Sequence, residues 1–370
     1  MEKFFDVHTH YTQFLRDVSI AEQVELYKKE MELTGTYKLS FLACAHHADG
    51  GQHLTFDPLQ NIRGLYLKHA FAPVGYAFAA LEHTKMDADK ATRSADYLAQ
   101  AKEYHAAGFD GIKMLEGYPS VRKVMGVPLC DEVYDAFYSY LEENRIPIIL
   151  HVANPPEYWD ASKVSDWVKK AGRACDDTYP TKDGLQKEVD EVMKKHPKLR
   201  LALAHFGFMS YDINQAKAWL DDYENTLFDL TPGGEQLINM GNNWDKWHEF
   251  FVQYQDRIVY GSDLRAFPYT TQEEWETSVM RRPGLVRKFF ETNEKHVYVG
   301  SETTEFCGVA LEKEIREKIY YKNAEREYGE PRKIDYEYMK NKAKELLATK
   351  PTVDSYAQSD LEYIIKELEK

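Results

Sequence analysis

Two histidines lie one residue apart near the start of the chain, in the segment Asp6-Val7-His8-Thr9-His10. They end a short apolar run that has the composition of a buried β-strand. Because successive side chains of a strand point to opposite faces, His8 and His10 point to the same face and can bind one metal ion together. Paired histidines also occur without a metal, so this pair becomes informative only with partners from elsewhere in the chain.

Three further residues could complete such a site. His151 and His205 each end an apolar, strand-like run, and Asp263 follows the run that ends at Gly261. Taken singly, a histidine that closes a strand is often only hydrogen-bonded, and an aspartate after Gly-Ser is often a helix cap. Together, the four strand ends favour a metal site. Neutral imidazole and carboxylate suit Zn²⁺, while Mn²⁺, Fe²⁺ and Ni²⁺ are alternatives.

The elements that must position these residues are eight short apolar runs, which we expect to be strands. They lie at residues 4–8, 39–45, 70–76, 111–115, 147–152, 201–205, 226–230 and 257–261. Helical patterns lie between most of them, at residues 20–31, 91–107, 131–143, 182–195, 211–223 and 244–254. This alternation predicts an α/β fold of the (β/α)8 TIM barrel type, and no Gly-x-Gly-x-x-Gly segment follows the first strand to suggest a dinucleotide site. The strand ends of such a barrel meet at one mouth, where active sites lie.

The last part of the chain has a different pattern. Beyond Glu274 the strand pattern largely stops, and residues 312–320, 335–347 and 359–368 predict charged amphipathic helices. We expect the barrel to occupy residues 1–328. Residues 329–370 would form a helical extension that packs on the outside of the barrel or makes a subunit contact.

Composition limits the classes of partner. A net charge of -14 over 370 residues argues against nucleic acids and anionic membrane surfaces, so we expect a small-molecule substrate. No run approaches the ~18 apolar residues of a membrane span, and the first residues lack a signal-peptide core, which predicts a cytoplasmic protein. The four cysteines, Cys44, Cys130, Cys175 and Cys307, form no Cys-x-x-Cys pair, which indicates reduced thiols. A homo-oligomer is compatible with the sequence, with the helical extension as the expected contact.

The order of the five candidate ligands resembles that of the amidohydrolase superfamily of metal-dependent hydrolases. Three further segments, at residues 111–113, 204–207 and 260–263, resemble the branch that contains both hydrolases and aminocarboxymuconate-semialdehyde-type decarboxylases. The run at residues 319–326 resembles the closing helix of that branch, so the resemblance spans residues 3–328. It implies a main metal ion held by His8, His10, His151 and Asp263. It also implies that His205 either binds a second metal ion or forms hydrogen bonds to the water and the substrate.

A metal ion in this site would lower the pKa of a bound water from about 15.7 towards 7. Asp263 is the candidate that accepts the water proton and passes it to the leaving group. We therefore expect a hydrolase that cleaves an amide, ester or lactone bond of a small molecule. One alternative is a non-oxidative decarboxylase that uses the same residues. Another is a metal-binding barrel without catalytic activity.

Two cationic residues have alternative roles. Lys113, on the fourth expected strand, can point into the mouth and bind an anionic substrate. In some relatives a lysine on that strand is carboxylated by carbon dioxide and bridges two metals, although we favour a mononuclear site here. Arg265 can clamp a substrate carboxylate or pair with a surface acid. The histidines in the loop at residues 45–51 either touch the substrate or have no catalytic role.

Overall fold

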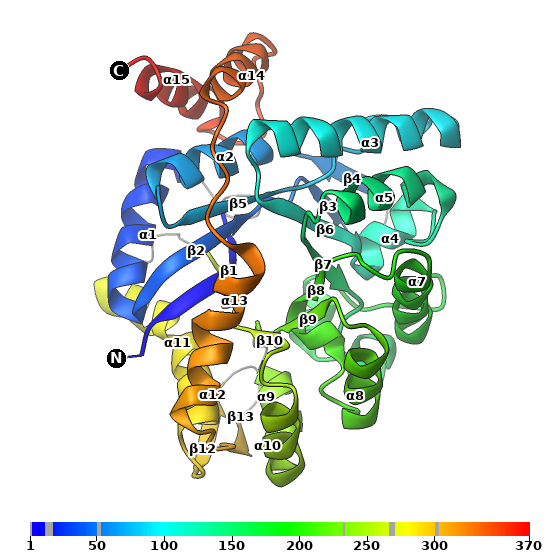
Figure 1. Ribbon diagram of the computed structural model, residues 1–370, viewed down its shortest axis with the longest axis vertical. Coiled ribbons are helices and arrows are strands. Elements are labelled where there is room, and N and C mark those ends of the chain that lie inside the picture. Colours follow the sequence, from blue (N-terminus) through cyan, green and yellow to red (C-terminus); the bar gives the residue numbers. More distant parts are fainter. Residues whose placement is uncertain (1, 12–17, 50–52, 232–233, 266–270, 300–302) are drawn as a thin grey trace.

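The fold is an eight-stranded parallel barrel, seen in a computed structural model that describes residues 2–11, 18–49, 53–231, 234–265, 271–299 and 303–370. The strands surround a central axis and helices surround the strands (Figure 1). The predicted TIM barrel is therefore confirmed. The barrel strands in sequence order are β1 (Phe4–His10), β2 (Thr36–Leu42), β5 (Gly75–Ala79), β6 (Gly111–Gly117), β7 (Ile148–Val152), β8 (Leu201–Leu203), β9 (Thr226–Asp229) and β10 (Ile258–Val259), with the short β11 (Leu264–Arg265) continuing the last.

The barrel closes between its first and last strands. β11 pairs in parallel with β1, with Thr9 opposite Leu264 and His10 opposite Arg265. Below this pair, the Val7 N–H donates a 3.0 Å hydrogen bond to the Tyr260 carbonyl. The eighth strand is thus interrupted at residues 260–263, beside the end of β1 that carries the two histidines.

The outer layer consists mainly of helices, and several of them begin with a side-chain cap. α1 (Ile20–Thr34) begins with a capping box between Ser19 and Glu22 and ends at Gly35, whose φ of 81° suits glycine. The other helices of this layer are α2 (Gln60–Ala70), α3 (Lys90–Ala107), α4 (Pro119–Met125), α5 (Asp135–Glu143), α6 (Asp166–Lys170), α7 (Lys182–Lys195), α8 (Ile213–Asp222), α9 (Gly234–Gly241), α10 (Trp244–Gln253) and α11 (Gln272–Glu291). Their buried faces form one large apolar core with the outside of the barrel.

The helical segment after the barrel covers the amino-terminal ends of its strands. α12 (Lys313–Glu317), a π-helical turn (Lys318–Lys322) and α13 (Asn323–Tyr328) follow one another directly. The Tyr328 ring packs on Phe5 and Phe78, with centroids 6.1 and 5.4 Å apart, and Asn323 Nδ2 donates to the Ile258 carbonyl. This end of the barrel is therefore closed by side chains, which leaves the opposite end for ligands.

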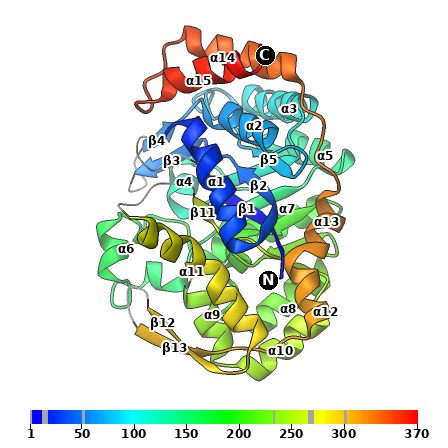
Figure 2. The ribbon, with the colours of Figure 1, turned by 90° about the vertical axis from the view of Figure 1, so that its left-hand side faces the viewer.

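The last two helices, α14 (Tyr336–Ala348) and α15 (Ala357–Glu367), pack outside α1, α2 and α3 (Figures 1 and 2). A fully buried arginine of α2 attaches them. Arg63 pairs with Asp354 at 2.7 Å and with Asp360 at 2.8 Å, and Asp360 also accepts a hydrogen bond from the Ile20 N–H. The extension thus rests on its own barrel.

Three sequence expectations about the elements are wrong. The strand expected at residues 70–76 begins at Gly75, because the apolar residues before it form the end of α2 and a turn at Pro73. Strands continue beyond Glu274: β12 (Lys295–Val299) pairs antiparallel with β13 (Thr303–Cys307), on the surface and without apolar alternation. The expected loop at residues 45–51 contains β3 (His46–Asp49), which pairs with β4 (His53–Phe56), while residues 50–51 lie outside the described part.

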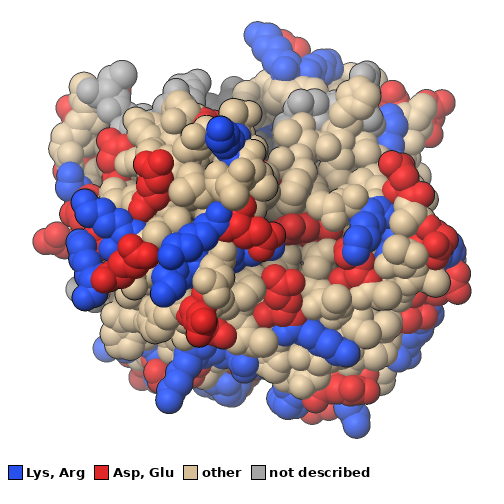
Figure 3. Space-filling model, turned by 90° about the horizontal axis from the view of Figure 1, so that it is seen from above, with Lys and Arg blue, Asp and Glu red and all other residues tan. Residues whose placement is uncertain are grey.

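The surface carries charges of both signs. The face seen from above in Figure 3 mixes Lys and Arg with Asp and Glu rather than separating them into patches of one sign. Of the helices that the structure describes, none has the length and apolar character needed to cross a membrane.

Candidate metal centre

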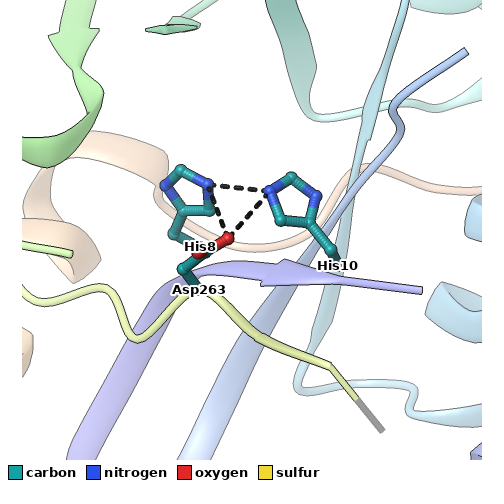
Figure 4. Close-up of side chains that lie close together, drawn as sticks. All are labelled: His8, His10 and Asp263. Carbon is teal, nitrogen blue, oxygen red and sulfur yellow. Dashed lines mark hydrogen bonds and ion pairs between the residues drawn. The ribbon is translucent and has the colours of Figure 1, made fainter. Parts of the chain in front are cut away.

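His8, His10 and Asp263 converge at the carboxyl-terminal mouth of the barrel (Figure 4). The Nε2 atoms of the two histidines are 3.0 Å apart, and the Asp263 Oδ1 atom lies 3.3 Å from Nε2 of His10 and 4.0 Å from Nε2 of His8. A tetrahedral ion with ligands at ~2.0–2.1 Å separates its ligand atoms by roughly 3.3 Å. The three side chains therefore have the spacing of ligands to one ion.

The protonation of the two imidazoles also fits a cation. His8 Nδ1 donates to the Asp229 carboxylate, and His10 Nδ1 donates to the Leu42 carbonyl at 3.0 Å. A neutral imidazole has a single N–H, so both Nε2 atoms carry lone pairs that face each other. Burial, assisted by the charge of Lys113, lowers the pKa of His8 well below its usual value and keeps the ring neutral. A divalent ion between these lone pairs would remove their repulsion.

Asp229 is a site residue that sequence analysis missed. Its Oδ1 atom accepts hydrogen bonds from the Thr231 N–H at 3.1 Å and from the Thr231 hydroxyl, which orients Oδ2 towards His8. Burial raises the pKa of Asp229 to about 6, against the opposing effect of Thr231. Asp229 ends the predicted strand at residues 226–230, so the strand-end criterion that selected His151 and His205 could also have found it.

A glycine makes room for this arrangement. A Cβ atom at Gly261 would lie 2.3 Å from Asp229 Oδ1, 2.6 Å from Thr231 Oγ1 and 2.7 Å from the His8 Cβ. No larger residue fits without displacing them. The break in the eighth strand at Gly261 thus lets the backbone approach the His8–Asp229 pair.

The same break directs Asp263 into the mouth. Asp263 has a left-handed φ of 54°, and its N–H donates to the His8 carbonyl at 2.7 Å. Beneath it, Asp6 Oδ1 accepts hydrogen bonds from the N–H groups of Ser262 and His8, at 3.0 and 3.1 Å. Burial raises the pKa of Asp6 to about 7. One buried carboxyl group therefore joins the two segments that carry the three candidate ligands.

His151 and His205 lie beside this cluster. The ring of His205 is 5.5 Å from that of His8 and 4.8 Å from that of His151, centroid to centroid. His205 Nδ1 donates to the Thr231 carbonyl at 3.2 Å, and His151 Nε2 donates to the Ala153 carbonyl at 3.0 Å. Burial lowers the pKa of His205 to about 3 and that of His151 well below its usual value, so both are neutral. Among the described residues, the close three-ligand group does not include them, and their ligand roles stay predictions.

Two cations reach the cluster. Lys113 is buried, and its Nζ atom lies 3.3 Å from His8 Nε2, on the lone pair that a metal ion would use. Burial lowers the pKa of Lys113. When an ion binds, Lys113 must therefore lose its proton, be carboxylated or turn towards an anionic ligand.

The second cation is Arg282 of α11, whose Nη1 group contacts Asp263 Oδ2 at 2.8 Å. Sequence analysis missed Arg282 because it comes from a helix rather than from a strand end. The predicted Arg265 pairs with His10 through its backbone, while its side chain lies outside the described part of the structure.

Comparison with known families decides the relationship. The amidohydrolase family model matches residues 75–329, which is more than half of the chain. The chain belongs to the amidohydrolase family. The match includes His151, His205 and Asp263 and begins after His8 and His10, which the barrel brings to the same mouth. No match is found among curated proteins.

Solved structures of the same fold agree with this membership. 4-Oxalomesaconate hydratase from Rhodopseudomonas palustris has 15% identity and a TM-score of 0.54, and the match covers 88% of this chain and 95% of that one. 2,6-Dihydroxybenzoate decarboxylase in complex with 2,6-dihydroxybenzoate has 15% identity and a TM-score of 0.51, with coverages of 89% and 99%. A dihydroxybenzoic acid decarboxylase from a Polaromonas species, with bound manganese and the inhibitor 2-nitroresorcinol, has 14% identity and a TM-score of 0.50, with coverages of 89% and 97%. At these identities the similarity establishes the fold alone.

The family, the barrel mouth and the three-ligand cluster together indicate a metal-dependent enzyme of the amidohydrolase superfamily. Two imidazoles and a carboxylate suit several divalent ions. The donor set does not select zinc over manganese.

Proposed function

We propose that this chain is a metal-dependent, non-oxidative decarboxylase of a small carboxylic acid. The observation that carries the proposal is the pair of cations at the metal cluster. Lys113 and Arg282 both contact candidate ligands, in a chain whose net charge is -14. Two cations beside a divalent ion create a local positive field that attracts a carboxylate, which a neutral amide or lactone does not need.

The comparisons support the lyase over the hydrolase that the sequence alone favoured. Solved structures with the same fold include decarboxylases of dihydroxybenzoic acids, one of them with manganese bound. The hydratase among them is likewise no amide or ester hydrolase. We therefore take the decarboxylase, formerly the alternative, as the leading hypothesis.

The environment of Asp263 supports the same choice. In a hydrolase, Asp263 would accept the proton of the attacking water. An arginine in direct contact favours the charged form of a carboxylate and weakens it as a base. Decarboxylation needs no such base, because it breaks the bond to the carboxylate, releases carbon dioxide and places one proton on the remaining carbon.

In this proposal different residues bind the metal ion, bind the substrate and donate the proton. His8, His10, His151 and Asp263 would hold a divalent ion, which would bind and polarise the acid or its neighbouring hydroxyl group. His205 donates through Nδ1 to the Thr231 carbonyl, so its Nε2 atom can accept a hydrogen bond from the substrate. Lys113, whose pKa is lowered by burial, is the proposed donor of the proton to the carbon.

The test offers metal-loaded protein two panels of compounds: small aromatic acids, and amides, esters and lactones. We expect carbon dioxide from an acid with a hydroxyl group next to the carboxylate, and no hydrolysis. Lys113→Gln should abolish this release, while Lys123→Gln, which alters a half-buried lysine of α4 that is bonded to Thr178, should leave it unchanged. Hydrolysis without carbon dioxide release would support the hydrolase and contradict the decarboxylase.

Metal stoichiometry and the intact mass of the protein complete this experiment. One ion per chain and an unmodified mass are expected. Two tightly bound ions, together with the added mass of carbon dioxide on Lys113, would replace the mononuclear site by a bridged binuclear one.

A further inference from the structure

One edge of the Arg282 guanidinium is bound to the protein and the other edge remains available. Nη1 donates to Asp263 Oδ2 at 2.8 Å and to the Ser262 carbonyl at 2.6 Å. Within the described part of the chain, the Nε and Nη2 groups have no acceptor of their own, although Glu235 of α9 lies within electrostatic range. The side chain is 32% exposed. Arg282 can therefore bind a ligand at the mouth without leaving Asp263.

The position of Arg282 is fixed from both sides. Trp275 and Val279, earlier on α11, pack with Leu264 of β11, and α11 lies beside α1 (Figure 2). The preceding residue, Arg281, donates to the Tyr298 hydroxyl of β12 at 2.7 Å. A guanidinium held in place in this way loses little further conformational freedom when it binds an anion.

The chemistry of decarboxylation decides which anion this arginine can usefully bind. The carboxylate that leaves as carbon dioxide loses its negative charge on the way to the transition state. Unlike a metal ion that also polarises the neighbouring hydroxyl group, a cation that pairs with the leaving carboxylate alone stabilises the bound acid more than the transition state, which lowers kcat. A carboxylate that stays on the substrate keeps its charge throughout, so pairing with it strengthens binding without opposing the reaction.

We propose that Arg282 binds a second, retained carboxylate, so that the preferred substrates are dicarboxylic acids. One carboxylate lies at the metal cluster and is lost, and the other accepts hydrogen bonds from the outer edge of the guanidinium. The inference rests on the proposed decarboxylase function for the role of the first carboxylate. Its direct support is that Arg282 contacts one oxygen of the Asp263 carboxylate, Oδ2, while the other oxygen, Oδ1, is the candidate metal ligand beside His10.

The experiment measures binding rather than turnover, so that it does not depend on finding the true substrate. Metal-loaded protein is titrated by calorimetry with 2-hydroxybenzoate and with its analogues that carry a second carboxylate at ring position 4 or 5. The variants are Arg282→Gln, Arg282→Lys and the control Lys288→Gln, which removes an exposed cation of the same helix outside the site. The metal content of every variant is measured first, because Arg282 also contacts the candidate ligand Asp263.

We expect one of the diacids to bind wild-type protein at least tenfold more tightly than the monoacid. Arg282→Gln should weaken the diacid by about 10- to 150-fold, as for a lost charged hydrogen bond, and leave the monoacid within about threefold. Arg282→Lys should recover part of this loss, and Lys288→Gln should match wild type. Three outcomes would overturn the inference: wild-type protein binds the monoacid and the diacid with equal affinity, Arg282→Gln loses equal affinity for both acids, or neither acid binds. Selective binding of the diacid without carbon dioxide release would instead support carboxylate binding by Arg282 and count against the proposed decarboxylase activity.

Discussion

At the scale of single residues, the His8–Asp229 hydrogen bond determines which nitrogen of His8 can bind a metal. Because the Asp229 carboxylate can only accept, it keeps the proton on Nδ1 and the lone pair on Nε2. In Asp229→Asn the side-chain amide can donate an N–H to His8 Nδ1. That bond would stabilise the tautomer with the proton on Nε2, which cannot bind a metal ion through that nitrogen. We expect a 10- to 100-fold loss of metal affinity, measured by competition with a chelator, with an unchanged circular dichroism spectrum.

The matched control for this substitution is Asp245→Asn, on the exposed side of α10. It makes the same chemical change away from the mouth and should keep wild-type affinity. If Asp229→Asn also bound the metal normally, the carboxylate would have no part in orienting His8.

The buried Asp6 predicts how stability depends on pH. Its pKa is raised by burial from 3.8 to about 7 in the folded protein, so the folded state holds this proton more tightly than the unfolded state. The stabilising contribution is therefore complete below pH 3.8 and is lost as the pH rises towards 7. For metal-free protein we expect the free energy of unfolding to fall over this range, by up to about 1.4 kcal/mol per pH unit.

Asp6→Asn isolates this contribution, because the amide oxygen can still accept from the N–H groups of His8 and Ser262. Denaturant unfolding between pH 4 and pH 7 should give a flatter pH dependence for this variant than for wild type. Asp229 titrates in the same direction in both proteins, and its charge affects the pKa of Asp6 less than burial does, so the difference between the two curves reports mainly Asp6. Parallel curves for the two proteins would mean that Asp6 is already ionised at low pH.

Residue by residue, the candidate site was accessible to sequence analysis only where side chains end strands. His8, His10, Asp263 and Lys113 follow from strand ends and alternation, and the structure brings them together at the mouth. Arg282 could not be found in this way, since its position depends on how α11 packs on β11 and on the β12–β13 hairpin. Those are tertiary contacts with no local signature.

At the scale of elements, the interrupted eighth strand is the feature that builds the site. Gly261→Ala should place a methyl group against Asp229, Thr231 and His8. We expect a loss of about 1–3 kcal/mol in the free energy of unfolding, as for other overpacked positions, together with weaker metal binding. Thermal unfolding with and without metal measures both effects.

Gly284→Ala is the control for this substitution. It lies within α11, and a Cβ there meets no atom within 4 Å, so stability should be unchanged or higher by up to about 1 kcal/mol. A Gly261→Ala protein as stable as Gly284→Ala, with normal metal affinity, would show that the eighth strand can adjust its path.

The elements that the sequence predicted well are those with a buried face. Barrel strands such as β7 and β9 are buried throughout and agree closely with their expected ranges. The β12–β13 hairpin was missed because most of its described side chains are exposed or half-buried, with Val297 54% accessible, and because its strands lack apolar alternation. The strand at residues 70–76 was misplaced because the turn that follows α2, at residues 71–74, is as apolar as a strand.

At the scale of the whole molecule, a buried cation joins the C-terminal extension to α2, beside the apolar faces of α14 and α15. Arg63→Met would leave Asp360 buried without its partner, and breaking such a pair typically costs about 3–5 kcal/mol. We expect a lower unfolding temperature and faster proteolytic release of α15. Lys344→Met, which removes an exposed ion pair with Glu369 in the same extension, should cost less than about 1 kcal/mol. Equal effects of the two substitutions would mean that the Arg63 pairs do not anchor the tail.

A subunit contact through the extension remains our expectation for the assembled protein. The outer faces of α14 and α15 are the surfaces it would use, since their inner faces rest on α1, α2 and α3. Sedimentation of wild type and of the Arg63→Met protein would show whether the same residues support an oligomer.

The candidate ligands come from the first strand and from the segment that interrupts the last, the two strands that meet only where the barrel closes. An ion bound there would join the beginning of the chain to residue 263. Backbone hydrogen bonds, including Val7 to Tyr260 and Asp263 to His8, and the Asp6 carboxyl group already link the two strands across this seam. The complete set of ligands would therefore form only after the first and last strands of the barrel have paired. A chain truncated before residue 257 would lack the third ligand, Asp263. In the full-length chain, the free energy of unfolding of the closed barrel would increase with the concentration of the metal ion.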